Sequence, residues 1–368
     1  MINAENLIIC PGFLDLHVHF REPGYEYKET ISTGSRAAIS GGYTQVCCMP
    51  NTMPPIDSSF RLSQQLEIIS SNAFCEVLPF VSMTVGRLGK NVDLDFLKCL
   101  NNFAGISDDG GSVENDQLME KICRFSVEND ILISAHCELS KSFPKKESEF
   151  EYLQRDLILV EKYRCRYHAQ HISCVESLNL ITQAKYDGLP VTCEVTPHHA
   201  LISNEQIADV GEFKMSPPLR SEFDRKNIVE NMLNGTVDAI ATDHAPHSKY
   251  EKSLGYYKSL NGVSGLECAF AVLHTGLVVS GIMSLQRLIF LMTQGPAKIL
   301  KKPEFSSELG IKIGARANLT IIDEHKVWKV NSEKFFSKGK STPFNNQIVV
   351  GKVVGAILNG KIMDIFPN

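Results

Sequence analysis

The sequence lacks the features that mark membrane, exported and nucleic-acid-binding proteins. No apolar run approaches the roughly 20 residues that span a bilayer, and the first residues contain no basic stretch followed by a long apolar one. Lys and Arg number 37 against 42 Asp and Glu, so the formal net charge of -5 gives no general attraction for nucleic acid. We therefore expect a cytoplasmic protein with no membrane and no nucleic-acid partner.

Three further absences narrow the chemistry. The 11 cysteines are odd in number and include no CxxC pair, which argues against a disulfide framework and a thiolate zinc site. Residues 107–113 lack the Gly-Lys-Ser/Thr ending of a phosphate-binding loop, and no serine lies in a nucleophile elbow. Hydrophobic residues nevertheless make up 43% of the chain, which is typical of a globular protein.

What the sequence does contain is a repeated unit, in which a β-prone run is followed by a polar loop and an amphipathic helical stretch. The β-prone runs are residues 13–19, 43–50, 75–83, 103–109, 130–137, 167–174, 191–197 and 237–244. The clearest helical stretches are residues 58–70, 115–127, 175–185, 222–233 and 266–279. Eight strands that alternate with helices predict an α/β fold, a TIM-type (β/α)8 barrel, over residues 11–308.

After residue 310 the pattern changes to short β-prone stretches with glycines, at 309–324 and 346–363. They predict a small, reduced β-domain made of residues 1–10 and 309–368. A helix over 284–300 is expected to bridge the two parts. The barrel would thus carry this small β-domain at its side.

Side chains that suit a metal ion fall at or near the ends of five predicted strands. They are His17, His19, Asp109, His136, His171 and Asp243. Because the carboxyl ends of barrel strands meet at one face, we expect these side chains to lie together. His17 and His19 are two residues apart on a strand, so both imidazoles can reach one ion.

The segment PGFLDLHVHFREPG (11–24) resembles the signature of the dihydroorotases, within the cyclic amidohydrolase superfamily. The resemblance continues in order through MPNT (49–52), SDDG (107–110), AHCE (135–138), HIS (171–173), EVTPHH (194–199), PPLR (217–220), ATDHAPH (241–247) and SGLE (264–267). The order and spacing are similar to those of the type I branch. The resemblance implies a zinc-dependent, reversible cyclisation of N-carbamoyl-L-aspartate to L-dihydroorotate plus water, in pyrimidine biosynthesis.

The family pattern implies two zinc ions per chain, bridged by a carboxylate and a water or hydroxide. It divides the other ligands into His17, His19 and Asp243 for one ion and His136 and His171 for the second. Type I enzymes have an aspartate where many amidohydrolases carry a carboxylated lysine, and the family's spacing favours Asp109 over Asp108 as the bridge. The bridging hydroxide is the implied nucleophile, and Asp243 is the implied general base and then general acid.

The resemblance also implies substrate contacts by His19, Arg21, Asn51, Ser216, His247, Asn261 and Gly262. Arg21 suits a carboxylate because a guanidinium can donate two parallel hydrogen bonds. Ser216 departs from the family, which usually has an asparagine there, and we expect this change to cost about 1 kcal/mol of binding. Gly295 also stands where an asparagine is usual, on a helix expected to be remote from the metals.

Two other functions remain open. A hydantoinase or allantoinase-like enzyme would use similar chemistry, but such enzymes usually carry the bridging lysine that Asp109 replaces. A non-catalytic homologue could act as a partner of aspartate transcarbamoylase, but such proteins typically lose metal ligands. A homodimer and a transcarbamoylase complex both stay open, and a small-molecule substrate is expected.

Four other histidines are expected to play structural parts. His168 should point outward because it precedes His171 by three positions on a strand. His244 should face away from the metals because it follows Asp243 directly. His198 and His199 should support the site from its surroundings.

Overall fold

The computed structural model describes residues 4–98, 101–138, 146–302 and 311–363, and the structural statements below concern these residues. Its strands are β1 (Ile8–Pro11), β2 (Phe13–Val18), β3 (Tyr43–Cys48), β4 (Glu76–Pro79), β5 (Ile133–Ala135), β6 (Tyr167–Ala169), β7 (Val191–Val195), β8 (Ala239–Ile240), β9 (Leu319–Lys329), β10 (Ile348–Leu358) and β11 (Lys361–Ile362). Its longer helices are α1 (Ile31–Ser40), α2 (Ser59–Asn72), α4 (Asp116–Asn129), α5 (Lys146–Tyr163), α6 (Val175–Tyr186), α8 (Glu222–Asn234), α12 (Leu285–Met292) and α13 (Gln294–Leu300). Shorter ones are α3 (Leu94–Lys98), α7 (Pro197–Leu201), α9 (Lys249–Lys252), α10 (Gly255–Lys258) and α11 (Ala269–Leu273), which continues into a π-helix at His274–Val279.

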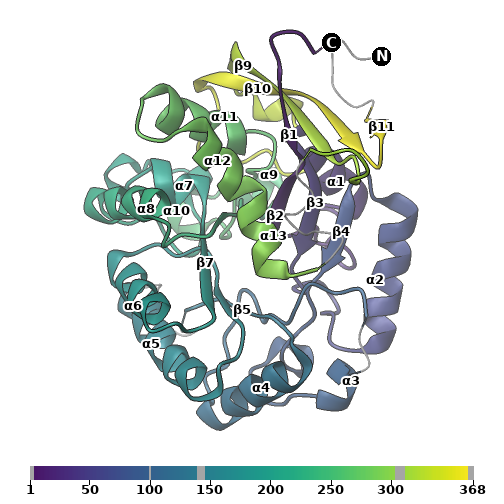
Figure 1. Ribbon diagram of the computed structural model, residues 1–368, viewed down its shortest axis with the longest axis vertical. Coiled ribbons are helices and arrows are strands. Elements are labelled where there is room, and N and C mark those ends of the chain that lie inside the picture. The colour runs from purple at the N-terminus through teal and green to yellow at the C-terminus, as the bar shows by residue number, and fades with distance from the viewer. Residues whose placement is uncertain (1–3, 99–100, 139–145, 303–310, 364–368) are drawn as a thin grey trace.

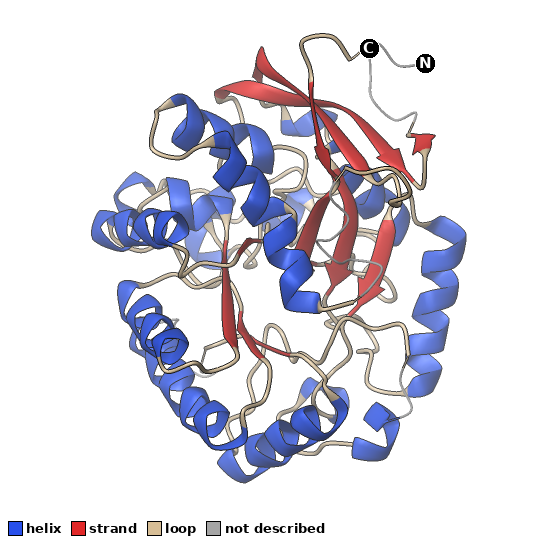
Figure 2. Ribbon diagram, in the orientation of Figure 1, coloured by secondary structure: helices blue, strands red, loops and turns tan. Residues whose placement is uncertain are grey.

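Seven of the strands form the wall of a closed barrel. Strands β2, β3 and β4 pair in parallel, and so do β5, β6, β7 and β8. Isolated bridges join the two groups, through Ile106 to Val81 and Ile133 on one side and through Val18 to His244 on the other. The ring confirms the predicted (β/α)8 barrel. Figures 1 and 2 show α2, α4, α5, α6 and α8 outside the strands.

The fourth predicted strand, residues 103–109, is much shorter than expected. Only Ile106 bridges to both neighbouring segments. A side chain at Gly105 would place its Cβ 2.5 Å from the carbonyl oxygen of Leu132, so the two backbones approach closely here. A turn then follows at once, in which the Gly111 amide donates to the Asp108 carbonyl at 2.8 Å. The turn therefore ends the extended segment soon after Ile106.

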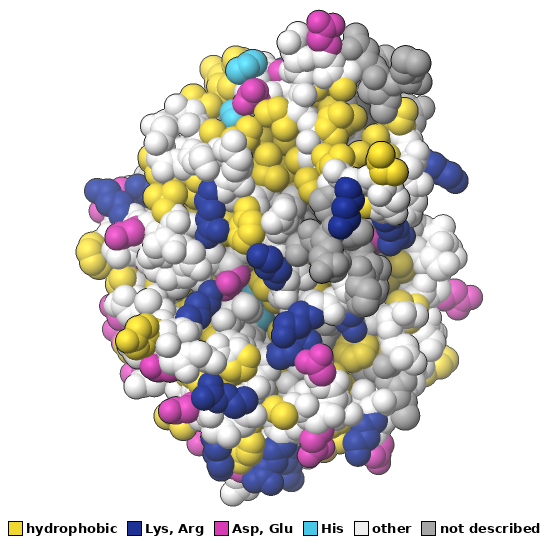
Figure 3. Space-filling model, in the orientation of Figure 1, with side chains coloured by type: hydrophobic (Ala, Val, Ile, Leu, Met, Phe, Trp, Pro, Cys, Tyr) yellow, Lys and Arg dark blue, Asp and Glu magenta, His cyan; other side chains and the backbone are white. Residues whose placement is uncertain are grey.

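A second sheet lies beside the barrel, in the strand order β1-β9-β10-β11, with antiparallel pairing throughout (Figure 1). Only Gly12 separates β1 from β2, so the first strand ties this sheet to the barrel. In Figure 3, hydrophobic side chains gather in the upper part of the molecule, where Figure 1 places β9 and β10. The division into residues 11–308 and residues 1–10 plus 309–368 stays a prediction, and part of its second boundary lies outside the described residues.

The predicted bridging helix over 284–300 is broken into α12 and α13 at Thr293, whose φ and ψ of -133° and -80° are not helical. Pro296 explains the break, because its ring removes an amide donor and clashes with the carbonyl four residues earlier. Helix α13 contacts β2 and β8. Its Leu300 and Ala297 join the buried cluster that includes Leu14 and Leu16 of β2, so α13 helps to hold the strand that carries the first two histidines.

The base of β2 is fixed by aromatic packing. Phe13 is fully buried and lies 5.6 Å from Tyr43 and 5.7 Å from Phe270, measured between ring centroids. The ten cysteines in the described part of the chain are all free and buried, so they pack as small apolar side chains. None of the helices in the described ranges is both long and apolar enough to pass through a membrane.

Candidate metal centre and active-site cavity

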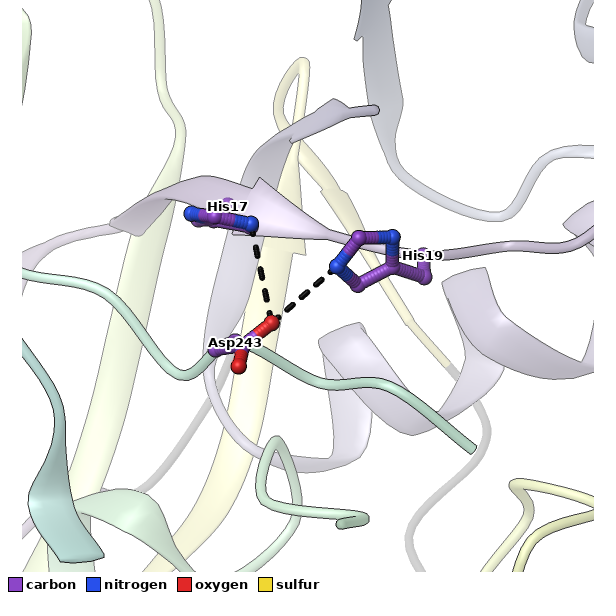
Figure 4. A group of neighbouring side chains, drawn as sticks. All are labelled: His17, His19 and Asp243. Atoms are coloured by element: carbon purple, nitrogen blue, oxygen red, sulfur yellow. Dashed lines mark hydrogen bonds and ion pairs between the residues drawn. The ribbon is translucent and has the colours of Figure 1, made fainter. Parts of the chain in front are cut away.

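The side chains of His17, His19 and Asp243 converge at the end of β2 (Figure 4). Oδ1 of Asp243 lies 3.5 Å from Nε2 of His17 and 3.0 Å from Nε2 of His19. All three side chains are buried, and their ligand atoms lie within 4.8 Å of one another. Imidazole and carboxylate in this arrangement suit a divalent transition metal such as zinc.

A second set of ligand atoms surrounds Asp109. Its carboxylate oxygens lie 3.3 Å from His17 Nε2, 3.5 Å from His19 Nε2, 3.5 Å from His136 Nδ1 and 3.8 Å from His171 Nε2. The neighbouring Asp108 points elsewhere and accepts a hydrogen bond from the Thr84 amide at 3.1 Å. The structure therefore places Asp109, as expected, between the two groups of histidines.

Three of the four histidines are oriented by hydrogen bonds on the ring nitrogen that faces away from this centre. Nδ1 of His17 lies 2.8 Å from Glu194 Oε1, and Nδ1 of His19 lies 2.8 Å from Asn51 Oδ1. Nε2 of His136 lies 3.1 Å from Glu138 Oε2. Such contacts fix which nitrogen keeps its proton, so the opposite nitrogen can offer a lone pair to a metal.

The charges of the cluster are strongly coupled. Burial favours neutral imidazole, but the surrounding carboxylates, Asp109 foremost, together outweigh it and raise the pKa of His17 well above its usual value. Burial likewise disfavours ionised Asp109, but the surrounding histidines, His17 foremost, together outweigh it and hold the pKa of Asp109 well below its usual range. The carboxylates are thus ionised at neutral pH, and a metal cation can replace the protons held between them and the imidazoles.

Zinc binding is expected to release at least one proton per chain at pH 8. Burial lowers the pKa of His136, but hydrogen bonds with Asp109 and Glu138 raise it to about 10, so the ring is protonated at this pH before a metal binds. The metal needs the neutral ring, so affinity should fall as the pH falls. Calorimetric titration in two buffers of different ionisation enthalpy counts the protons. Binding heats that do not depend on the buffer would contradict this coupling.

The converging side chains lie at a cavity of about 360 Å³. Its lining includes every predicted substrate contact, namely His19, Arg21, Asn51, Ser216, His247, Asn261 and Gly262. It also includes His136, His171, Asp109 and Asp243, whereas His17 lies beneath it. Gly262 has φ of 132°, and a Cβ there would lie 2.4 Å from the Ala245 carbonyl oxygen, which explains the glycine at this wall.

Some predicted substrate contacts already have protein partners. Both polar atoms of the Asn51 side-chain amide face candidate metal ligands. Its Oδ1 lies 2.8 Å from His19 Nδ1, and its Nδ2 lies 3.4 Å from Asp109 Oδ2. His247 faces the Asn261 carbonyl oxygen at 2.7 Å through Nε2 and Lys28 Nζ at 3.3 Å through Nδ1. Burial and then the charge of Arg21 lower the pKa of His247 to about 3, so the ring is neutral and donates through Nε2. These two residues shape the site as well as lining it.

Arg21 differs, because no carboxylate of the described residues lies within ion-pair distance of it. Its Nε donates to the Pro246 carbonyl at 3.3 Å, and a terminal nitrogen lies 3.5 Å from His247 Nε2. A cation that lines a cavity without a carboxylate partner favours an anionic ligand. Arg21 therefore marks the wall at which a substrate carboxylate is best accommodated.

Ser216 donates to Glu138 Oε2 at 2.6 Å, and the same oxygen faces His136. Ser216→Ala is therefore expected to loosen Glu138 and to lower zinc affinity by up to about ten-fold, together with a several-fold rise in KM. Ser216→Asn, which restores the residue usual in the family, should lower KM. Zinc titration measures the affinity, and steady-state kinetics measures KM. If Ser216→Ala changes neither the zinc affinity nor KM, the hydroxyl supports neither metal binding nor substrate binding.

His168 has the structural role expected of it, but the predicted outward direction is wrong. Its ring lies inside the barrel, with Nε2 3.1 Å from Glu194 Oε2, and the same carboxylate orients His17. Strand alternation fails as a guide because β6 ends at Ala169 and His171 has a positive φ of 30°. His168 thus supports the ligand set through Glu194.

The other histidines lie where they were expected. His244 faces Glu29, with 3.4 Å between Nε2 and Oε2, away from the metal centre. His199 is held by Thr196 and by the Pro217 carbonyl oxygen. His198 is buried, and its Nε2 has no hydrogen-bond partner among the described residues.

The sequence interpretation missed two carboxylates that matter to the site, Glu138 and Glu194. Both lie within motifs that it noted, AHCE and EVTPHH. Glu138 follows His136 by two positions, which is the spacing of side chains on one face of a strand. Glu194 precedes the end of β7, where barrel side chains face the active site. The spacing from His136 could therefore have identified Glu138, and the position near the end of β7 could have identified Glu194.

Comparison with known proteins agrees with this site. The model of the amidohydrolase family matches residues 8–363, so the chain belongs to the amidohydrolase family, whose members are metal-dependent. Within it, the chain is 39% identical to a dihydroorotase of Brevibacillus brevis, over 98% of this chain and 89% of the relative. It is also 39% identical to a dihydroorotase of Bacillus subtilis, over 98% of this chain and 88% of the relative.

Solved structures show the same fold in more distant proteins. The L-hydantoinase (dihydropyrimidinase) of Arthrobacter aurescens has a TM-score of 0.89 at 24% identity, covering 98% of this chain and 86% of that chain. The dihydropyrimidinase of Brevibacillus agri has a TM-score of 0.87 at 20% identity, with the same coverage. At this level of identity the likeness concerns the barrel and its attached sheet.

Proposed function

We propose that the protein is a dihydroorotase, which cyclises N-carbamoyl-L-aspartate to L-dihydroorotate and water and runs the reaction in reverse. The observation that carries the proposal is the convergence of four histidines and two aspartates at a cavity whose wall holds Arg21 without a carboxylate partner. The dihydroorotase relatives at 39% identity support the same reaction.

The ligand set fits two zinc ions, held by His17, His19 and Asp243 on one side and His136 and His171 on the other, with Asp109 between them. Bound there, zinc would polarise the amide carbonyl and lower the pKa of the attacking water. His136 Nδ1 and His171 Nε2 are hydrogen-bond partners 2.9 Å apart, so after loss of the shared proton both nitrogens could bind one ion, which supports this assignment.

Asp243 would act as the general base and then the general acid. Burial opposes its ionisation, but hydrogen bonding to His19 and the nearby imidazoles keep the pKa of Asp243 below its usual value. The carboxylate can therefore accept a proton from the attacking water at neutral pH. It can then deliver that proton to the departing amide nitrogen, which would otherwise leave as an unstable anion.

Arg21 would hold the substrate carboxylate by paired hydrogen bonds. The backbone at Asn261 and Gly262 would face the ring amide, and His247 fixes the Asn261 carbonyl. The contacts of Asn51 suggest that it aids catalysis mainly by orienting His19.

We place this activity in pyrimidine biosynthesis in the cytoplasm, and association with a second copy or with aspartate transcarbamoylase stays a prediction.

A substrate panel tests the proposal. Zinc-loaded protein should hydrolyse L-dihydroorotate and cyclise N-carbamoyl-L-aspartate, with much weaker turnover of hydantoin and dihydrouracil, which lack the carboxylate. In Arg21→Ala this preference should collapse, because truncation removes the charged partner of the carboxylate. Preference for hydantoin over dihydroorotate would instead favour a hydantoinase.

A further inference from the structure

A second cavity, of about 620 Å³, lies where the attached sheet meets the barrel. Its walls come from the end of α1, from α11 and from β9 and β10. It shares no lining residue with the active-site cavity. A volume of this size falls within the range of small-molecule sites in proteins, so the cavity could hold a ligand of its own.

The lining of this cavity is strongly basic. Lys326, Lys329, Lys334 and Lys352 all contribute, and none of them pairs with a carboxylate of the described residues. Burial and the charges of Lys326 and Lys334 lower the pKa of Lys352, which indicates that these ammonium groups lie close together. An anion bound among them would relieve their mutual repulsion.

Glu267 is the one acidic residue in the lining, and its oxygens are already used. They accept hydrogen bonds from the backbone amides of Phe336 at 2.9 Å and Ser337 at 3.3 Å. Burial raises the pKa of Glu267 to about 7, so its negative charge is reduced near neutral pH. Glu267 therefore fixes the wall of the cavity and offsets little of the lysine charge.

The cavity also offers an aromatic surface beside the lysines. Trp328 is held by a hydrogen bond from its Nε1 to the Gly351 carbonyl at 3.0 Å. The ammonium of Lys352 lies 5.6 Å from the centre of the indole ring. Phe336 is partly buried in the same lining. A fixed indole next to cationic groups suits a flat ring that carries an anionic group.

We propose that this cavity binds a small aromatic anion of the nucleoside monophosphate type. Its phosphate would lie among Lys326, Lys334 and Lys352, and its base would stack against Trp328. The inference does not depend on the dihydroorotase reaction. The competing explanation is structural: β1 pairs with β9 only as far as Ile322, so lysines on the remaining edge of β9 would discourage pairing with another chain.

Trp328 is the single tryptophan of the chain, so its fluorescence reports on this cavity alone. The intact protein would be titrated with uridine 5′-monophosphate, with excitation at the red edge of the tryptophan band, where uridine absorbs little. Saturable quenching is expected, at least about ten-fold weaker in a Lys334→Ala/Lys352→Ala double variant. Lys361→Ala on β11, outside the lining, should behave as the unmodified protein.

Two further results would overturn the proposal. If the nucleotide gives no saturable change, or the same change in the double variant, the lysines serve only to protect the edge of β9. If uridine without its phosphate quenches as strongly as the nucleotide, the anion has no part in binding. Turnover of L-dihydroorotate, measured on the same samples, reports separately on the proposed function.

Discussion

Asp243→Asn is expected to lower kcat for L-dihydroorotate by about 10²- to 10⁴-fold. The amide keeps the size of the carboxylate but cannot take the proton of the attacking water or pass it to the leaving nitrogen. It also weakens the ligand set that Asp243 forms with His17 and His19, where the carboxylate oxygen lies 3.0 Å from His19 Nε2. Steady-state kinetics at saturating zinc measures the loss.

Asp238→Asn is the matched control. Asp238 lies one residue before β8, whereas Asp243 follows that strand. The Asp238 carboxylate pairs with Lys185 Nζ at 2.5 Å and accepts a hydrogen bond from the Cys193 amide at 2.8 Å. Its replacement should affect stability and leave kcat unchanged. A kcat for Asp243→Asn within a few-fold of that control would remove Asp243 from the proton transfer.

Asp109→Asn is expected to abolish tight binding of at least one zinc ion and, with it, nearly all turnover. The carboxylate of Asp109 lies within 3.8 Å of ring nitrogens from all four histidines, so its charge serves both groups of ligands. A neutral amide cannot balance two dications in this buried setting. Metal analysis after dialysis gives the stoichiometry directly.

The adjacent Asp108→Asn variant makes this test sharp. Asp108 is equally buried but accepts its hydrogen bond from the Thr84 amide, and burial raises its pKa to about 6. Its replacement should cost about 1–3 kcal/mol of stability while zinc content stays the same. Loss of zinc in Asp108→Asn and not in Asp109→Asn would show that the bridge has been assigned to the wrong aspartate.

Much of the barrel could be predicted because its strands are β-prone runs separated by regular helical patterns. The convergence of the candidate metal ligands followed from the barrel rule, since His17, His136 and Asp243 each lie near the end of a strand. The rule gives no lengths, so the single bridging residue Ile106 was not foreseen. The close approach of Gly105 to the Leu132 carbonyl oxygen likewise becomes visible only when the segments pack.

The supporting carboxylates were harder to predict for a similar reason. Glu194 contacts His17 and His168 from a different strand, and the distances of 2.8 and 3.1 Å result from barrel closure. Local alternation placed His168 outside, because it assumed that the strand continues to His171. The basic cavity beside Trp328 also joins segments far apart in the chain, so no local sequence pattern predicts it.

The central claim is that this ligand set makes a zinc-dependent dihydroorotase. Its most direct test is a zinc titration of metal-depleted protein during continuous measurement of L-dihydroorotate hydrolysis. We predict that turnover rises from background and saturates near two zinc ions per chain. Saturation of the metal sites without turnover in either direction, or full turnover in the thoroughly depleted protein, would contradict it.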